Sequence, residues 1–369
     1  MNQPGWATEE GTANYRKRFE GRIAADHFRL SQGLWLSSIG IGTYLGNHDA
    51  AADDLYRKAV IRSVELGSNV IDSAINYRFQ RSERSVGAAL KELAAKGFGR
   101  SEIVVATKGG FLPFDGSPPS DIRSYFVETF VKPGIAGPSD LAAGCHCMTA
   151  SYLLNQLDLS RKNLDVDCID IYYLHNPETQ LAEASRQEFK DRLFKAFQAL
   201  EGAVTAGKIR MYGTATWNAY RNDPETREYL SLSEVVEVAS KAGGDDHHFK
   251  VIQLPLNLAT PEALTKKNQT VGSEQLSALE AAQRLGITVM CSASILQGQL
   301  ARNLPPFVGE VFTGLETDAQ RSLQFVRSTP GVATALVGMK RLHHVEENLK
   351  VAGLSPVTWE RYAKLFKES

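Results

Sequence analysis

The sequence predicts an α/β fold, a single (β/α)8 barrel (TIM barrel) in which parallel strands alternate with helices. Short apolar runs alternate with amphipathic segments along the chain, and polar side chains stand at the ends of several apolar runs. The 369 residues exceed the length of about 250 that such a barrel commonly needs. The barrel domain is expected over residues 27–369. Residues 1–26 lack periodicity, so we expect an extension that lies on the surface or is partly disordered.

The composition narrows the protein class. Hydrophobic residues make up 43% of the chain and charged residues 22%, as in an ordinary globular protein. The net charge of -1 gives no reason to expect a nucleic acid or an anionic membrane as a partner. No long apolar run indicates a membrane span, and the polar first 20 residues do not resemble a secretory signal. The four cysteines are expected to be reduced thiols in a cytoplasmic protein. The composition gives no oligomeric state.

The N-terminal part of the barrel can be assigned in order. Residues 28–35, with Gln32-Gly33 at the centre, are typical of a short hairpin. The first barrel strand is expected over residues 36–44. An amphipathic helix over 53–66 ends at Gly67 and is followed by a buried strand that ends at Asp72.

The remaining segments keep the same alternation. Further strands are expected at 103–108, 169–175, 209–214, 251–257, 287–292 and 333–337. Helices are expected at 82–95, 149–159, 187–206, 232–242, 273–285, 318–328 and 343–351. Long loops rich in Gly and Pro follow the third strand (109–148) and the seventh (294–317). Long loops at the active face of a compact domain usually have a function.

Polar side chains at successive strand ends are the main functional signal. Asp72, Lys108 and His175 each follow an apolar run, Tyr77 comes five positions after Asp72, and Gln253 lies in the sixth strand. Burying unpaired charges is costly, so these residues are hard to explain as core. Barrel enzymes carry their chemistry at the C-terminal ends of the strands. Taken alone, Asp72 and Tyr77 are equally consistent with a helix cap and a surface tyrosine.

Several motifs together resemble the aldo-keto reductase superfamily. They are Gly67 to Tyr77, Ser82-Glu83-Arg84-Ser85-Val86-Gly87, Ala106-Thr107-Lys108, Tyr173-Leu174-His175, Gly207-Lys208-Ile209-Arg210, Gln253 and Glu347-Asn348. They occur in order from about residue 34 to about residue 349. The resemblance implies an enzyme that interconverts aldehydes or ketones with alcohols by means of a nicotinamide cofactor, and a hairpin that closes the barrel bottom.

The resemblance assigns catalytic roles to Asp72, Tyr77, Lys108 and His175. Tyr77 is expected to be the proton donor, but the ordinary pKa of a phenol, about 10, is too high for easy transfer. We expect Lys108 to lower this pKa and Asp72 to orient Lys108. His175 is expected to hydrogen-bond the substrate oxygen. The alternative is a structural salt bridge beside two core aromatic rings.

The cofactor site is expected across the barrel mouth, because no Gly-x-Gly-x-x-Gly motif follows a strand. The resemblance implies that Gln253 contacts the nicotinamide amide and that Glu347 and Asn348 bind adenine. The phosphates are expected in the loops after strands seven and eight, which contain Ser292, Leu296, Gly298, Gly338, Lys340 and Arg341. The two cations favour NADP, with NAD possible. Alternatively, they form a solvated basic turn.

The nicotinamide surroundings depart from the superfamily pattern. The usual Ser-Asn pair after strand five is Ala215-Thr216, and Asn218 is a candidate substitute. The usual stacking tyrosine is Leu256, which removes a flat aromatic face. Trp217 or a residue of the long loop is a candidate replacement.

A substrate pocket is expected around Tyr44, Phe111 and Trp217, whose aromatic faces suit an apolar or carbohydrate ligand. No metal is expected. Cys145-His146-Cys147 lacks the usual zinc-ligand spacing and has no second cluster.

Two other functions stay open. The altered nicotinamide surroundings are consistent with a regulatory or interaction subunit that holds the cofactor as a sensor, as some members of the superfamily do in channels. The acid and base groups are also consistent with a barrel enzyme without net redox chemistry, such as an isomerase.

Overall fold

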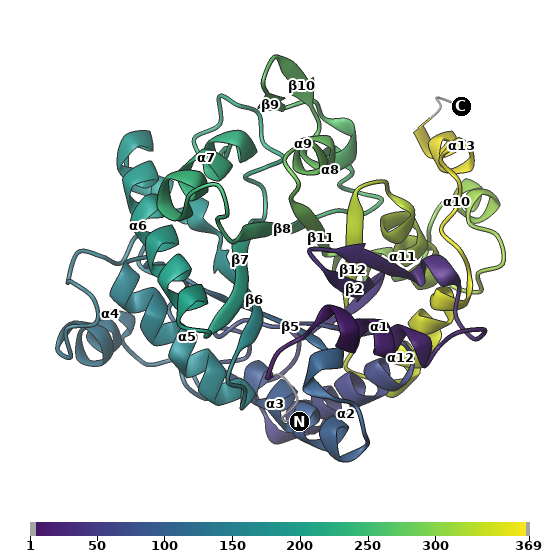
Figure 1. The fold of residues 1–369 in the computed structure, drawn as a ribbon, viewed down its shortest axis with the longest axis horizontal. Coiled ribbons are helices and arrows are strands. Elements are labelled where there is room, and N and C mark those ends of the chain that lie inside the picture. The colour runs from purple at the N-terminus through teal and green to yellow at the C-terminus, as the bar shows by residue number, and fades with distance from the viewer. Residues whose placement is uncertain (1–4, 367–369) are drawn as a thin grey trace.

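Eight parallel strands form a closed barrel in the computed structural model, which describes residues 5–366 (Figure 1). Their order around the barrel is β11-β12-β3-β4-β5-β6-β7-β8. The strands are β3 Ile39–Gly42, β4 Val70–Asp72, β5 Val104–Gly109, β6 Ile169–His175, β7 Ile209–Ala215, β8 Phe249–Pro255, β11 Thr288–Ser292 and β12 Val332–Gly338. Each pairs in parallel with both neighbours, so the predicted (β/α)8 architecture is confirmed.

Helices surround the strands as an outer ring (Figure 1). They are α2 Ala50–Glu65, α3 Arg81–Ala95, α5 Ala150–Leu164, α6 Arg186–Thr205, α7 Leu232–Gly243, α9 Ala278–Arg284, α11 Asp318–Ser328 and α12 Leu342–Leu349. Outward-facing strand residues such as Ile71 and Val105 pack with helix residues such as Leu93 in the main core. Inward-facing residues such as Val70, Val104 and Ile171 fill the barrel interior as a second cluster. This two-layer core fixes the strand ends on which the site is built.

The sixth predicted helix is shorter than expected. Residues 273–285 are predicted to be helical, but β9 Gln269–Val271 and β10 Glu274–Leu276 form an antiparallel hairpin around Gly272. Helix α9 begins only after Ser277. Ser277 and Glu280 form a reciprocal capping box there. The two side chains accept hydrogen bonds from backbone N–H groups that have no partner at the start of a helix.

The N-terminal hairpin closes the bottom of the barrel. Strands β1 Phe28–Ser31 and β2 Leu34–Ser37 are joined by Gln32 and Gly33, both with positive φ, as a tight two-residue hairpin requires. Leu34 and Leu36 of β2 belong to the interior cluster of the barrel. The predicted hairpin is therefore confirmed.

Residues before the hairpin contain a packed helix that the sequence does not predict. Helix α1 Glu9–Lys17 lies against β2, with Thr8 as its N-cap. Its residue Tyr15 is fully buried, and the phenol donates a hydrogen bond to the carbonyl of Val64 (2.5 Å). The expected surface extension thus does not describe this segment. Its helical signal is weak because few apolar residues in this short helix face the barrel.

The loops at the other end carry additional elements. The loop after β5 contains α4 Ile122–Phe126 and a π-helical turn, Val127–Val131, which pack around a small apolar cluster. The loops after β8 and β11 carry α8 Glu262–Thr265 and α10 Pro306–Val311, and α13 Trp359–Tyr362 lies near the C-terminus. Across residues 5–366, no helix has the length and apolar character of a membrane span.

Candidate active site

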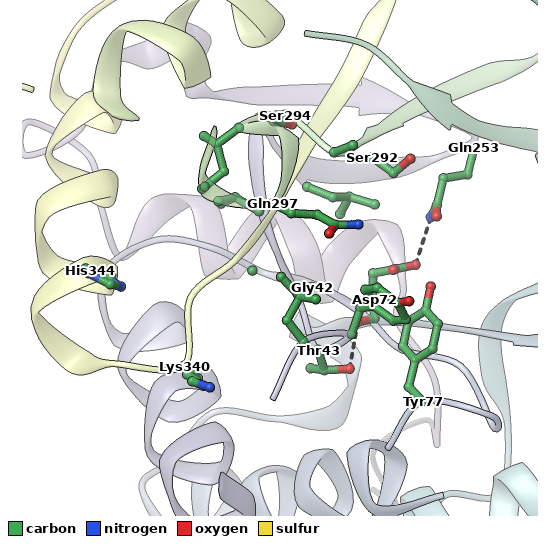
Figure 2. Close-up of a pocket in the computed structure, with 18 of the residues that line it drawn as sticks. Gly42, Thr43, Asp72, Tyr77, Gln253, Ser292, Ser294, Gln297, Lys340 and His344 are labelled. Carbon is green, nitrogen blue, oxygen red and sulfur yellow. Dashed lines mark hydrogen bonds between the residues drawn. The ribbon is translucent and has the colours of Figure 1, made fainter. Parts of the chain in front are cut away.

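A cavity of about 1160 Å³ opens at the C-terminal ends of the barrel strands. Strand-end residues Gly42, Asp72, His175, Ala215, Ser292 and Gly338 all line it. The other predicted residues in its wall are Tyr44, Tyr77, Phe111, Trp217, Gln253, Gly298, Lys340, Arg341, Glu347 and Asn348. Residues that are far apart in the sequence thus form one pocket (Figure 2).

Asp72 and Lys108 form a buried ion pair at one end of the pocket. Lys108 Nζ donates to Asp72 Oδ2 (2.7 Å) and to the carbonyl of Ser73 (2.8 Å). Gln253 Nε2 donates to the other carboxylate oxygen of Asp72 (2.8 Å), and Figure 2 shows this contact. All three side chains are buried, so each charge and amide has a specific partner. The link from Gln253 to Asp72 does not follow from the sequence.

Tyr77 lies directly against this pair. Lys108 Nζ is 4.8 Å from the centroid of the Tyr77 ring. The ring also contacts Tyr44 and His175, at centroid distances of 4.8 Å and 5.8 Å. The phenol therefore stands between the ion pair and the open part of the pocket.

The pKa of Tyr77 differs from the sequence-based expectation. It is raised well above the ordinary value, first by burial and then by the charges of Asp72 and Tyr44. Lys108 is expected to lower it, but the ammonium charge is compensated by Asp72 at 2.7 Å. Burial also lowers the pKa of Lys108, although Asp72 opposes this shift. Tyr77 consequently remains a protonated phenol at neutral pH.

His175 is held in place by a histidine that the sequence analysis did not assign to the site. His146 Nε2 donates to the carbonyl of His175 (2.8 Å), and Gln180 Nε2 donates to His146 Nδ1 (2.8 Å). Burial lowers the pKa of His146 to about 4 and that of His175 well below its ordinary value. Both imidazoles are neutral at pH 7. Phe111, a predicted pocket residue, packs edge-on against both imidazole rings.

The same contacts account for the Cys145-His146-Cys147 motif. Both His146 ring nitrogens are engaged with protein atoms, and the buried Cys147 thiol lies 3.4 Å from the hydroxyl of Thr149. Nowhere in residues 5–366 do three or more potential metal ligands come together.

Aromatic side chains form the outer wall beside Tyr77. Tyr44 is 54% exposed and Trp217 is 44% exposed, although both line the pocket. Phe111 completes this wall from the long loop after β5. These three predicted substrate residues are thus brought together, and they present apolar faces at the pocket mouth.

The opposite side of the pocket is basic. Lys340 and Arg341 follow β12, and Arg302, which the sequence analysis did not single out, reaches the wall from the loop after β11. None of these three cations forms an ion pair with any described residue. In Figure 2, Lys340 and His344 lie on the side away from Gln253 and Tyr77. Arg302 could have been found in the sequence as a cation in the irregular loop after the seventh strand.

Helix α12 supplies the wall next to these cations. Glu347 Oε1 accepts a hydrogen bond from the hydroxyl of Thr317 (2.7 Å). Asn348 is buried, and its Oδ1 finds no hydrogen-bond partner within residues 5–366. A buried amide oxygen without a partner at a pocket wall is unusual in a folded protein and suits a ligand N–H group.

Some predicted residues are not brought to the pocket. Asn218 lies outside its wall, and its Oδ1 accepts from Arg221 (3.0 Å). Leu296 also lies outside, while its neighbours Ile295 and Gln297 line the cavity. Leu256 is fully buried in the main core, so it offers no face to a nicotinamide ring. Thr216 lines the pocket instead, with a buried hydroxyl that has no partner in the described part of the chain.

A family model, the aldo/keto reductase family, matches residues 38–239, more than half of the chain. The chain belongs to the aldo/keto reductase family. The resemblance drawn from the sequence motifs is confirmed.

The chain is also similar to individual aldo/keto reductases and related proteins. A putative voltage-gated potassium channel subunit beta of Schizosaccharomyces pombe is 22% identical, over 92% of this chain and 91% of the relative. An NADH-specific methylglyoxal reductase of Escherichia coli is 28% identical, over 60% of each chain. A solved aldo/keto reductase from Klebsiella pneumoniae, in complex with NADP and acetate, has a TM-score of 0.61 at 20% identity and covers 92% of this chain and 94% of that one.

The pocket of this aldo/keto reductase fits a nicotinamide dinucleotide. Its basic side offers cations that form no ion pair within residues 5–366, and such cations suit phosphate groups. Asn348 Oδ1 and the Thr216 hydroxyl are buried polar atoms without a partner in the same range, one near each end of the cavity. Gly298 and Gly338 are also in the wall, where small residues leave room for a ligand.

Proposed function

We propose that this aldo/keto reductase interconverts aldehydes or ketones with alcohols, with NADP as cofactor and Tyr77 as proton donor. One observation supports this most directly. Lys108 Nζ lies 4.8 Å from the centroid of the Tyr77 ring, and Tyr77 lines the same cavity as Arg302, Lys340 and Arg341, which form no ion pair within residues 5–366. A proton donor and an anion-binding surface in one pocket are the two requirements of cofactor-dependent carbonyl reduction.

The residues around Tyr77 suit the proton step of this reaction. When bound in this pocket, a nicotinamide cofactor would supply the hydride, with its two electrons, for the carbonyl carbon. The carbonyl oxygen then takes the Tyr77 proton, and the new C–H and O–H bonds give the alcohol. Tyr77 carries its proton at neutral pH because burial raises its pKa. The Lys108 ammonium can stabilise the phenolate that remains. Neutral His175 can hydrogen-bond the same oxygen.

The preference for NADP is supported by the charges at the other end. The 2′-phosphate of NADP adds negative charge, and Lys340, Arg341 and Arg302 offer positive charge that no described residue pairs with. We assign Gln253, Ser292, Gly298, Gly338, Glu347 and Asn348 to the rest of the cofactor. Gln253 would then hold both Asp72 and the nicotinamide end.

The substrate is proposed to be a small carbonyl compound or a sugar. Tyr44, Phe111 and Trp217 form an aromatic wall without a charged group, which suits apolar and carbohydrate faces. We also propose a cytoplasmic location, because all four cysteines are free thiols.

A second candidate function is a cofactor-binding regulatory subunit. The chain is similar over about nine-tenths of its length to proteins named as potassium channel subunits. Leu256 offers no stacking face to the nicotinamide, and this loss reduces control over hydride-transfer geometry. Cofactor binding without carbonyl turnover would be the property of such a subunit.

The first experiment titrates the purified protein with NADPH and NADH while cofactor fluorescence is followed. A panel of aldehydes, ketones and aldoses is then supplied with the preferred cofactor, and the alcohol is identified by mass spectrometry. Tighter binding of NADPH together with alcohol formation is expected. Tighter binding of NADH would overturn the cofactor assignment alone. Binding without turnover across the panel would favour the regulatory subunit, and no binding of either cofactor would contradict both proposals.

A further inference from the structure

The three residues after Tyr77 adopt a left-handed backbone. Arg78, Phe79 and Gln80 have φ values of 49°, 56° and 68°. Such values are unfavourable for residues that carry a Cβ atom, and consecutive occurrences are rare outside glycine-rich turns. A strained segment persists only where its surroundings hold it in place, and such segments gather at active sites. The turn therefore needs anchors, and the structure shows them on both sides.

Arg78 anchors the turn on the side of α2. Its side chain is only 2% exposed, and its Nη2 donates to Asp53 Oδ1 (2.5 Å). Its Nε donates to the carbonyl of Asn47 (2.8 Å), and its guanidinium lies 5.1 Å from the centroid of the Tyr56 ring. The Arg78 guanidinium thus bridges the strained turn to three groups that belong to α2 and the loop before it.

The long loop after β5 holds the opposite side. The N–H of Gly116 donates to the carbonyl of Phe79 (3.1 Å), and Gln80 Nε2 donates to the carbonyl of Phe114 (3.2 Å). The rings of Phe79 and Phe114 also pack against each other, with centroids 6.1 Å apart. These contacts are weaker than the charged contacts of Arg78, because they involve neutral groups and a loop.

Tyr77 lies between two fixed points. On one side the chain comes from β4, where Asp72 is bonded to Lys108 and Gln253. On the other side the turn begins at once with Arg78. The phenol can therefore reach the pocket in one position only if the turn keeps its left-handed path.

We propose that Arg78, anchored on Asp53, is a positioning residue that sets the Tyr77 phenol for proton transfer. This inference rests on the proposed role of Tyr77. Displacing a catalytic group by about an ångström can reduce turnover roughly a hundredfold, while distant binding contacts persist.

Arg81 provides a matched control. It also pairs with Asp53 (2.5 Å), but it follows the turn at the start of α3 and its side chain is 26% exposed. Arg81→Met removes one cation from the same carboxylate without touching the left-handed residues. If Arg78 only balanced the charge of Asp53, Arg78→Gly and Arg81→Met should lower kcat by the same amount.

The test compares Arg78→Gly, Arg78→Lys and Arg81→Met with the unmodified protein. Glycine removes the anchor and tolerates positive φ, so Arg78→Gly should fold. We expect a fall in kcat of about 10- to 100-fold for Arg78→Gly. A change of less than about threefold is expected for Arg81→Met, and an intermediate value for Arg78→Lys. The Kd for NADPH and the Tm should change little. Hydrogen exchange of residues 76–80, followed by mass spectrometry, should be faster only in the Arg78 variants.

The outcomes separate this inference from the proposed function. If Tyr77→Phe is inactive while Arg78→Gly keeps the kcat and the exchange rates of the unmodified protein, positioning by Arg78 is overturned and the proton donor stands. Equal losses in Arg78→Gly and Arg81→Met would also overturn it. If Tyr77→Phe stays active, the proton-donor assignment falls, and the inference falls with it. A global loss of Tm in Arg78→Gly and Arg78→Lys alike would assign Arg78 to stability instead.

Discussion

The two ends of the pocket differ in how their polar groups are satisfied. At the end that contains Tyr77, Lys108 bonds Asp72, and Gln253 bonds the same carboxylate. At the other end, Lys340 and Arg341 form no ion pair, and Asn348 Oδ1 has no partner within residues 5–366. The Asp72–Lys108–Gln253 network at the first end is satisfied by its own members, whereas the second end presents cations and an amide oxygen that have no partner within residues 5–366.

This difference indicates a division of work. A network that is satisfied internally keeps its geometry fixed before the substrate arrives, as preorganised catalytic groups require. A set of unpaired cations and an unpaired amide gains its partners on binding. Substitutions at the first end should therefore affect turnover and stability, and substitutions at the second should affect cofactor affinity.

The largest effect is expected for Tyr77→Phe. Loss of the proton donor should lower kcat by about 10²- to 10⁴-fold, the typical share of general acid catalysis. The Kd for NADPH should stay within about twofold, because the hydroxyl is not among the groups assigned to the cofactor. Turnover is measured from the loss of NADPH absorbance. Tyr229→Phe, which removes a hydroxyl bonded to the carbonyl of Asn268 outside the pocket, is the control. Turnover that survives in Tyr77→Phe would contradict the assignment.

The next effect concerns the buried ion pair. Lys108→Met leaves the Asp72 carboxylate buried without its cation, which should lower the free energy of unfolding by about 3 to 5 kcal/mol. Lys350→Met is a matched control, because Lys350 pairs with Glu316 at 3.0 Å and is 62% exposed. An exposed pair contributes about 1 kcal/mol or less. Urea unfolding measures both free energies. Equal losses would show that the buried Asp72–Lys108 pair contributes no more to stability than an exposed pair.

At the basic end, Lys340→Ala combined with Arg341→Ala should weaken NADPH binding by about tenfold or more, since each charged hydrogen bond contributes about 1.5 to 3 kcal/mol. NADH lacks the 2′-phosphate and serves as the internal control, with a much smaller change. The NADPH preference of the unmodified protein should also decrease as salt is added. Equal weakening of both cofactors would place the cations on the shared pyrophosphate.

The last effect concerns Glu178, beside the pocket wall, and appears in the pH dependence of stability. Its Oε1 accepts from the N–H of Trp217 (3.3 Å), and burial raises its pKa to about 8. Between the ordinary carboxyl pKa of about 4.5 and this value, the folded protein holds a proton that the unfolded chain releases. The free energy of unfolding should therefore fall as pH rises through this window. Glu178→Gln should remove that slope, whereas Glu225→Gln, at an exposed site, should keep it. Urea unfolding at several pH values measures it.

Features that depend on strand periodicity could be predicted from the sequence. Asp72 and His175 end their strands as expected, because apolar runs fix where a buried parallel strand stops. Lys340 reaches the pocket because the barrel brings all C-terminal strand ends to one face. Asn348, on helix α12, was indicated only by its match to a family motif, and the family resemblance also supplied the catalytic roles.

Apart from the Asp72–Lys108 contact, which the family resemblance implied, contacts between distant side chains could not be predicted. The link from Gln180 through His146 to His175 joins a loop to two separate segments, and no sequence motif indicates it. The direction of the Tyr77 pKa shift is set first by burial and then by the charges of Asp72 and Tyr44, and both depend on the folded structure. Helix α1 escaped prediction because its stability comes from packing on the barrel and not from its own periodicity.

We propose that Tyr77, as proton donor, and the basic end of the same pocket, as cofactor site, together permit hydride transfer from NADPH to a carbonyl. Incubation with NADPH deuterated at the transferred position, followed by mass spectrometry of the product, tests this most directly. We expect an alcohol that carries deuterium on the former carbonyl carbon, formed in step with NADPH oxidation and absent in Tyr77→Phe. An unlabelled product, or a substrate converted while NADPH stays reduced, would contradict hydride transfer and favour a barrel enzyme without net redox chemistry.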